Sequence, residues 1–259
     1  MATIAIDRTA KNIVLAVQEY SLFAWRSLLN LFHPPIYWTD FLMQSDVIGV
    51  GSLPIVILSG FFTGGVLALQ SAATLSEFGA TAVTGQFVGL TMIRELGPVL
   101  TGIMVSGRNA SSMASELGSM VVTEQIDAMR ALGVDPIRKL VTPRIFATIT
   151  MLLFLTIVAD AFGIMGGAAV TVFLNHQNGT QYFNNAYEHL AYPDIIQGLV
   201  KPLVFGYIIA SIGCFYGMRT TGGTEGVGRS TISAVVNSSV LIIAVDFLIT
   251  HILLSMFPT

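Results

Sequence analysis

The sequence is poor in charge and in cysteine, and both shortages narrow the class of protein. Of its 259 residues, 10% are charged and 53% are hydrophobic, whereas a soluble domain carries about 25% charged residues. Too few polar side chains are present to cover a water-soluble globule, so the composition indicates an integral membrane protein. The single cysteine, Cys214, excludes an intrachain disulfide framework. The four histidines lack ligand spacing, so no metal site is expected.

Long apolar segments, in contrast, are abundant. Five of them follow one another along the chain, at 47–76, 86–118, 143–175, 195–218 and 231–257. The first carries no charge, and at about 1.5 Å per residue it exceeds a bilayer core of about 30 Å, so a helix there must tilt or bend. We therefore expect an all-α integral membrane protein with five transmembrane helices. An odd number of spans places the two termini on opposite sides of the membrane.

Residues 1–45 have a different pattern. Hydrophobic residues recur at helical spacing over 12–32, with polar residues between them. The His-Pro-Pro sequence at 33–35 then predicts a helix end. Aromatic residues of the kind that favour the membrane–water boundary follow, namely Tyr37, Trp38 and Phe41. We interpret 1–45 as amphipathic helices lying in the interface, ahead of a five-span permease domain at 46–259. A soluble helix packed on a partner is the alternative.

The basic residues predict the orientation of the spans. Three regions that share one side contain nine lysines and arginines: Arg8, Lys11, Arg26, Arg130, Arg138, Lys139, Arg144, Arg219 and Arg229. The opposite regions, 77–85, 176–194 and 258–259, contain none. Because cytoplasmic loops are enriched in lysine and arginine, the N-terminus is expected inside and the C-terminus outside.

The longest inner loop contains a predicted short helix at about 123–132, with the sequence TEQIDAMRAL. Thr123 can cap its N-terminus, where Glu124 suits the positive end of the helix dipole. Gly133 can end the helix, and Pro136 prevents its return. An apolar stripe is formed by Ile126, Met129 and Leu132. Two uses are open: a connector packed on its own protein, or a helix that docks in a groove of a soluble partner.

Several charged residues fall inside the predicted spans. Arg94, Glu95, Asp160 and Asp246 are expected within the membrane, Arg108 and Glu116 in the cytoplasmic half of the second span, and Lys201 near the start of the fourth. Unpaired charge facing lipid is costly, so each should face a partner or a wet cavity. Arg94 could bind a lipid phosphate, for which its planar fork is suited, while Glu95 could hold that arginine. A purely structural pair is the alternative. For Asp160 and Asp246, pairing between helices and proton coupling are both open.

Two separated stretches carry a resemblance to a known family. They are MIRELGPVLTGIMVSGRNASSMASELGSMVVTEQIDAMRALGVDPIRKLVTPR and GGTEGVGRSTISAVVNSSVLIIAVDFLIT, in which charged, glycine and proline positions match in order. The chain resembles MlaE-type permeases, the membrane subunits of bacterial phospholipid ABC transporters that work with MCE-domain proteins. One departure is Ala110, where the family usually has a glycine. No phosphate-binding loop is present, because GGTEGVGRS lacks the GK[ST] ending.

The resemblance implies an assembly in the bacterial inner membrane. A homodimer of this chain would bind two ATPase subunits inside, a hexamer of MCE-domain protein outside, and a STAS-domain protein through the ATPase. Phospholipid would be the substrate, and outer-membrane lipid asymmetry the outcome. This chain would hold no cofactor and would not be an enzyme, because ATP and Mg²⁺ belong to the ATPase. No nucleic-acid partner is expected.

The resemblance also assigns residues. A lipid pocket between two permease copies would take its wall from the first two spans, which by position gives Leu67, Leu69, Leu75 and Phe78, with Arg94 and Glu95 nearby. The short inner helix would couple to the ATPase through Glu124, Gln125, Ile126, Asp127, Met129 and Arg130. Two other functions stay open: an ion-coupled secondary transporter that uses the intramembrane charges, and a membrane scaffold without transport.

Overall fold

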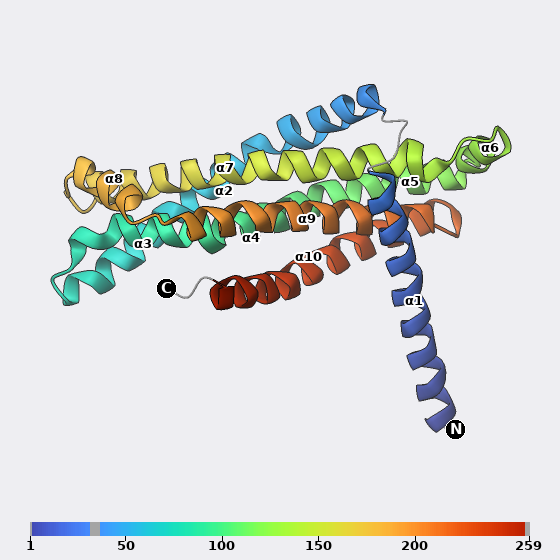
Figure 1. Cartoon of the computed structure of the whole chain (residues 1–259), viewed down its shortest axis with the longest axis horizontal. Coiled ribbons are helices and arrows are strands. Elements are labelled where there is room, and N and C mark those ends of the chain that lie inside the picture. Colours follow the sequence, from blue (N-terminus) through green and yellow to red (C-terminus); the bar gives the residue numbers. More distant parts are fainter. Residues whose placement is uncertain (1, 32–36, 257–259) are drawn as a thin grey trace.

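The chain folds as a bundle of long helices, described here from a computed structural model over residues 2–31 and 37–256. Five helices are long and apolar enough to cross a membrane. Four of them are α2 (Trp38–Glu77), α7 (Thr142–Phe173), α9 (Tyr192–Met218) and α10 (Gly223–Met256). They run side by side, and α1 (Ala2–Asn30) leaves the bundle at a steep angle near one end (Figure 1). The expected all-α membrane fold is confirmed.

The second span is composite. It comprises a 3-10 turn η1 (Thr81–Val83), α3 (Thr84–Thr91), α4 (Gly97–Val105) and α5 (Ser111–Val122), joined by π-helical turns η2 (Met92–Leu96) and η3 (Ser106–Ala110). Pro98 has no N–H and would clash with the carbonyl four residues before it, so a wider turn ahead of it relieves the conflict. The same reasoning applies to the π-helical turn η4 (Ile137–Val141), which precedes Pro143.

Short helices complete the two ends of the bundle. On the predicted cytoplasmic side, α6 (Gln125–Ala131) follows α5. At the opposite end, α8 (Gly179–Glu188) packs on α3, where Gly85 and Gly89 approach the backbone of Tyr182 and Ala186. Burial raises the pKa of the Tyr182 phenol, whose hydroxyl donates to the Ile164 carbonyl at 3.2 Å. Tyr182 therefore stays a neutral donor that holds α8 against α7.

Glycine allows the backbones of α2 and α7 to pack closely against each other. A Cβ built on Gly64 would lie 1.9 Å from the Gly163 carbonyl oxygen, and one on Gly60 would lie 2.6 Å from that of Ala159. Likewise, a Cβ built on Gly166 would lie 1.9 Å from the Phe61 carbonyl oxygen. In a membrane, where lipid is as apolar as a side chain, such small residues let two backbones meet. This contact fixes the position of α2, which carries the predicted pocket wall.

The N-terminal region differs in part from the expectation. One helix, α1, covers Ala2–Asn30, while residues 38–45 belong to the first span, which starts earlier than expected. The reason is packing: Phe41 lies 4.7 Å from Phe146 of α7 between ring centroids, so these aromatic residues continue the helix. Val17 and Trp25 of α1 are exposed, which suits a helix at the membrane surface. The predicted break at 33–35 lies outside the described residues.

The loop before the last span is also shorter than expected. The predicted spans leave a loop at 219–230, but α10 begins at Gly223. Gly222 and Gly223 adopt φ values of +90° and +65°, which complete the reversal in two residues. Gly226 then packs against the Thr221 carbonyl, so the helix can start immediately.

Candidate functional site

The π-helical turn η2 directs its charged side chains to other helices. Arg94 donates from Nε to Asp194 Oδ1 at 2.6 Å, and its Nη2 lies 2.5 Å from the same oxygen. Asp194 is buried at the start of α9, where Oδ2 accepts from the Ala191 N–H at 2.9 Å. Arg94 therefore binds the second span to the first turn of α9. Its side chain is 28% exposed.

Glu95 joins a second cluster, one that centres on Lys201. Lys201 is completely buried, donates to Glu95 Oε2, and lies 2.9 Å from Asp246 Oδ1. Thr250 of α10 donates to Glu95 Oε1 at 3.2 Å. One lysine thus faces two carboxylates, and a single charged network joins η2, α9 and α10 inside the bundle. Arg94 and Glu95 are neighbours in sequence but do not pair with each other.

Asp160 lies apart from both clusters. Its Oδ1 is buried and has no hydrogen-bond partner among the described residues. A Cβ on Gly97 would lie 1.7 Å from this oxygen, so the carboxyl group of α7 packs directly on the glycine that follows η2. A side chain at position 97 would overlap with the Asp160 carboxyl group, so the observed position of that group requires glycine at 97. Of the two expected intramembrane acids, Asp246 forms an ion pair with a lysine of another helix, and Asp160 forms none with the described residues.

Two open hollows follow α2 on the face toward the second span. One, of about 320 Å³, is lined by Phe62, Thr63, Val66, Leu67, Gln70 and Leu96. The other, of about 310 Å³, is lined by Leu67, Gln70, Ser71, Thr74, Leu75 and Phe87. Among the predicted pocket residues, Leu67 and Leu75 line them. Leu69 and Phe78 are exposed without lining either hollow, and Arg94 and Glu95 point toward α9 and α10.

The partners of the charged residues were missed in the sequence. Lys201 and Asp194 are separated from Glu95 and Arg94 by 106 and 100 positions. A usable signal did exist, because a lysine inside an apolar run requires a counter-charge, and the acids expected inside the membrane were Glu95, Asp160 and Asp246. The short helix α8, against which Gly85 and Gly89 pack, was not predicted.

The short inner helix differs from its prediction at the N-terminus. Thr123 does not cap α6, because its hydroxyl donates back to the Ser119 carbonyl at 2.8 Å. Glu124 instead turns the chain with φ +59°. The end at Gly133 is confirmed, with φ +75°. Ile126 is buried, whereas Leu132 is 81% exposed, so the helix rests on α5 through one apolar residue and offers another to the outside.

Asp127 and Arg130 of α6 form an exposed ion pair at 2.9 Å. Gln125 and Met129 complete the predicted coupling set; the amide of Gln125 donates to Thr123 Oγ1 at 3.0 Å, and Met129 is half-buried. None of these contacts leaves the helix and its own loop. A partner can therefore contact the polar face of α6 without breaking any contact between this helix and the rest of the bundle.

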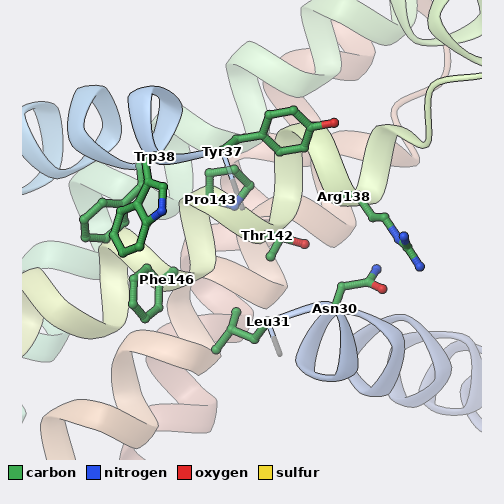
Figure 2. A pocket seen from close by; sticks show the side chains of 9 residues that line it. Asn30, Leu31, Tyr37, Trp38, Arg138, Thr142, Pro143 and Phe146 are labelled. Atoms are coloured by element: carbon green, nitrogen blue, oxygen red, sulfur yellow. The ribbon is translucent and has the colours of Figure 1, made fainter. Parts of the chain in front are cut away.

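A small hollow lined by aromatic residues lies where α1 ends and α2 and α7 begin. Figure 2 shows the side chains of Tyr37, Trp38 and Phe146 around it, with Leu31 closing one side. Its volume is about 60 Å³. Lys139 lies 2.5 Å from Asp40 and 4.2 Å from the Tyr37 ring centroid. These contacts join the start of α2 to η4, while α1 is held at this end of the bundle by Tyr207 of α9, whose hydroxyl donates to the Ala24 carbonyl at 2.7 Å.

Comparison with known proteins identifies the family. The family Permease MlaE matches residues 41–252. The chain is 43% identical over 248 residues to a probable ABC transporter permease protein of Rickettsia felis, covering 96% of each chain. It is 35% identical over 211 residues to the intermembrane phospholipid transport system permease protein MlaE of Haemophilus influenzae, covering 81% of each. It is also 37% identical over 229 residues to protein TRIGALACTOSYLDIACYLGLYCEROL 1, chloroplastic, of Arabidopsis thaliana, covering 88% of this chain and 65% of that one.

The helices and these matches agree. Five apolar helices make the chain a multi-pass membrane protein, and the matches extend over nearly all of them. The chain belongs to the MlaE permease family of ABC transporter membrane subunits.

Proposed function

We propose that this chain is the phospholipid permease of a multisubunit ABC transporter in the bacterial inner membrane, with its N-terminus cytoplasmic and its C-terminus periplasmic. Two copies would form the pathway, two ATPase subunits would drive it, and a hexamer of MCE-domain protein would receive or deliver lipid outside. A STAS-domain protein would bind the ATPase. The outcome would be outer-membrane lipid asymmetry. The relative named as an intermembrane phospholipid transport permease supports the substrate class.

The hollows along α2 carry this proposal. Six of their ten lining residues are apolar, and the other four are polar: Thr63, Gln70, Ser71 and Thr74. An acyl chain is apolar and flexible, and a groove of this kind can hold one while a partner covers it. A second copy across the groove would complete the pocket that Leu67, Leu69, Leu75 and Phe78 are proposed to line.

The charged network is connected to this groove through the π-helical turn η2. Leu96 lines the groove, while the preceding Arg94 and Glu95 reach α9 and α10 from the same π-helical turn. A change in the groove at Leu96 would therefore shift contacts to Asp194 and Lys201. The proposed mechanism is alternating access without covalent chemistry. ATP-driven motion enters through α6, and the lipid must bind the states of the cycle with different affinity for net transport.

The test is transport by the reconstituted complex. Proteoliposomes containing the permease, the ATPase and the MCE-domain protein are given labelled phospholipid and ATP, and the direction of movement is scored. Arg94→Ala and Glu95→Ala should each lower transport about tenfold or more while the complex still assembles. Wild-type transport by both variants would remove these residues from the mechanism. If gentle extraction of the permease brings no ATPase subunit, the ABC assignment fails.

A secondary transporter is the second candidate, and the unpartnered oxygen of Asp160 is the observation that favours it. An acid with a free buried oxygen could exchange a proton during a cycle. Transport driven by a proton gradient in vesicles without ATPase would support this function, whereas strict dependence on ATP would exclude it.

A further inference from the structure

Arg108 differs from the other lysines and arginines described in the five spans, because it has no carboxylate partner among the described residues. Every other described lysine or arginine on the five spans has a carboxylate within 4.0 Å: Arg94, Arg138, Lys139, Arg144, Lys201 and Arg229. Arg108 has none among the described residues, and it is exposed. An arginine at membrane depth without a counter-charge is costly, and none of the described residues supplies one.

The local structure holds this side chain in place. Nη1 donates to Ser52 Oγ at 3.0 Å and, more weakly, to the Val47 carbonyl at 3.4 Å. Gly51 makes room, because a Cβ there would lie 2.2 Å from Nη2 and 2.4 Å from Nη1. The guanidinium therefore lies flat on the backbone of α2. Ser52 is buried, so one end of the fork is fixed inside the bundle.

The other edge of the fork has no partner among the described residues. Nε and Nη2 make no hydrogen bond there, and these two donors form the edge that binds two oxygens of a phosphate or carboxylate at once. The surroundings are apolar and open: Val47 and Val50 of α2 are 43% and 61% exposed, and no atom lies within 4 Å of a Cβ placed on Gly107. A ligand for this edge combines an anionic head with an apolar body.

The depth also fits a lipid. Val47 follows Asp40 by seven residues, about 10 Å along α2, and Asp40 pairs with Lys139 at the predicted cytoplasmic end. The head-group layer on each side of a bilayer is about 6 Å thick, so Arg108 lies near its inner boundary. Moreover, Arg108 follows Leu96 by twelve residues, about 18 Å along the same two helices that form the hollows.

We propose that Arg108, positioned by Gly51 and Ser52, binds the phosphodiester of a phospholipid from the cytoplasmic leaflet, with the acyl chains along Val47 and Val50. The site is separate from the pocket proposed above and lies at the opposite end of the same helix pair. It goes beyond the proposed function, because binding here requires neither ATP nor transport.

The experiment is native mass spectrometry of the full-length protein in detergent, titrated with phosphatidylglycerol and, separately, with diacylglycerol of the same chains. Arg108→Gln should lower the affinity of one phosphatidylglycerol site about tenfold, because a charge-assisted bond is lost, and should leave diacylglycerol binding unchanged. Arg229→Gln removes an exposed cation that is already paired with Glu225 and serves as the matched control. Equal binding by Arg108→Gln and wild type would overturn the proposal.

A second pair of variants keeps the arginine. Gly51→Ala places a methyl group where the guanidinium lies and should weaken phosphatidylglycerol binding as Arg108→Gln does. Gly107→Ala adds the same methyl group one residue from Arg108 in open space and should not. Because Gly51→Ala retains the charge, this comparison decides the matter even if Arg108→Gln fails to fold. Equal binding by both glycine variants would contradict the geometry.

Two other anions could satisfy Arg108, and the same spectra identify them. If Arg108→Gln converts a dimer into monomers while lipid binding is unchanged, the partner is a carboxylate of a second copy and the proposal is wrong. If excess inorganic phosphate displaces phosphatidylglycerol from the wild type, the site accepts free phosphate and the lipid assignment is wrong. Persistence of the lipid in both comparisons is the expected result.

Discussion

Lys201 of α9 lies completely buried, with its Nζ 2.9 Å from Oδ1 of Asp246 on α10. The same amine donates to Glu95 of the second span, so three helices share one cation. A buried ion pair adds little net stability, but removal of one member leaves the others without compensation. The network therefore sets the relative position of the three helices more than it adds to the free energy of unfolding.

Lys201→Met should lower the free energy of unfolding by about 3–5 kcal/mol, because Glu95 and Asp246 then face each other without a cation. Neutralising both acids in the same chain, as Glu95→Gln and Asp246→Asn, should restore most of this loss. Thermal unfolding of the detergent-solubilised protein measures both effects. Arg229→Gln, which removes an exposed pair, should cost at most about 1 kcal/mol. A triple variant as unstable as Lys201→Met would contradict the network.

Gly97→Ala should destabilise the bundle, since its methyl group would overlap with the Asp160 carboxyl group. Asp160→Ala in the same chain should recover part of the loss, although the Met92 carbonyl, 2.9 Å from the new Cβ, still opposes the substitution. The pair can be measured as a double-mutant cycle by chemical unfolding. Additive effects would show that Asp160 and Gly97 are not in contact in the native protein.

The sequence predicted the architecture but not the partners. Runs such as 143–175 are long and apolar, so span number and helical class follow from composition and length alone. The π-helical turns depend on how Pro98 and Pro143 strain the backbone, and the partners of Arg94 and Glu95 depend on which helix faces which. These relationships are tertiary. The order of the spans along the sequence does not determine that Glu95 pairs with a lysine 106 residues away.

Gly64→Ala should be costly, because the new Cβ would lie 1.9 Å from the Gly163 carbonyl oxygen, a backbone atom that cannot rotate away. The helices α2 and α7 would have to separate, at a cost of about 3 kcal/mol in the free energy of unfolding. Gly228→Ala adds the same methyl group to α10 in open space and should be neutral or slightly stabilising. Equal stability of the two variants would contradict the close α2–α7 contact.

Leu132→Ser and Asp127→Lys test the proposed coupling helix without disturbing the fold. Leu132 is 81% exposed and Asp127 forms only an exposed pair with Arg130. The free energy of unfolding of each variant should therefore lie within about 1 kcal/mol of the wild-type value. Both should nevertheless weaken binding of the ATPase subunit about tenfold, since one loses an apolar anchor and the other reverses a charge at the docking face.

A pull-down of the ATPase from purified components measures the loss. Glu188→Lys, a reversal of an exposed charge at the opposite end of the bundle, is the control, and equal retention of ATPase by all three variants would remove α6 from the interface. Ile126→Ser would act differently: because Ile126 is buried, that variant should lose stability together with ATPase binding, which separates the anchor of the helix from the surface it offers.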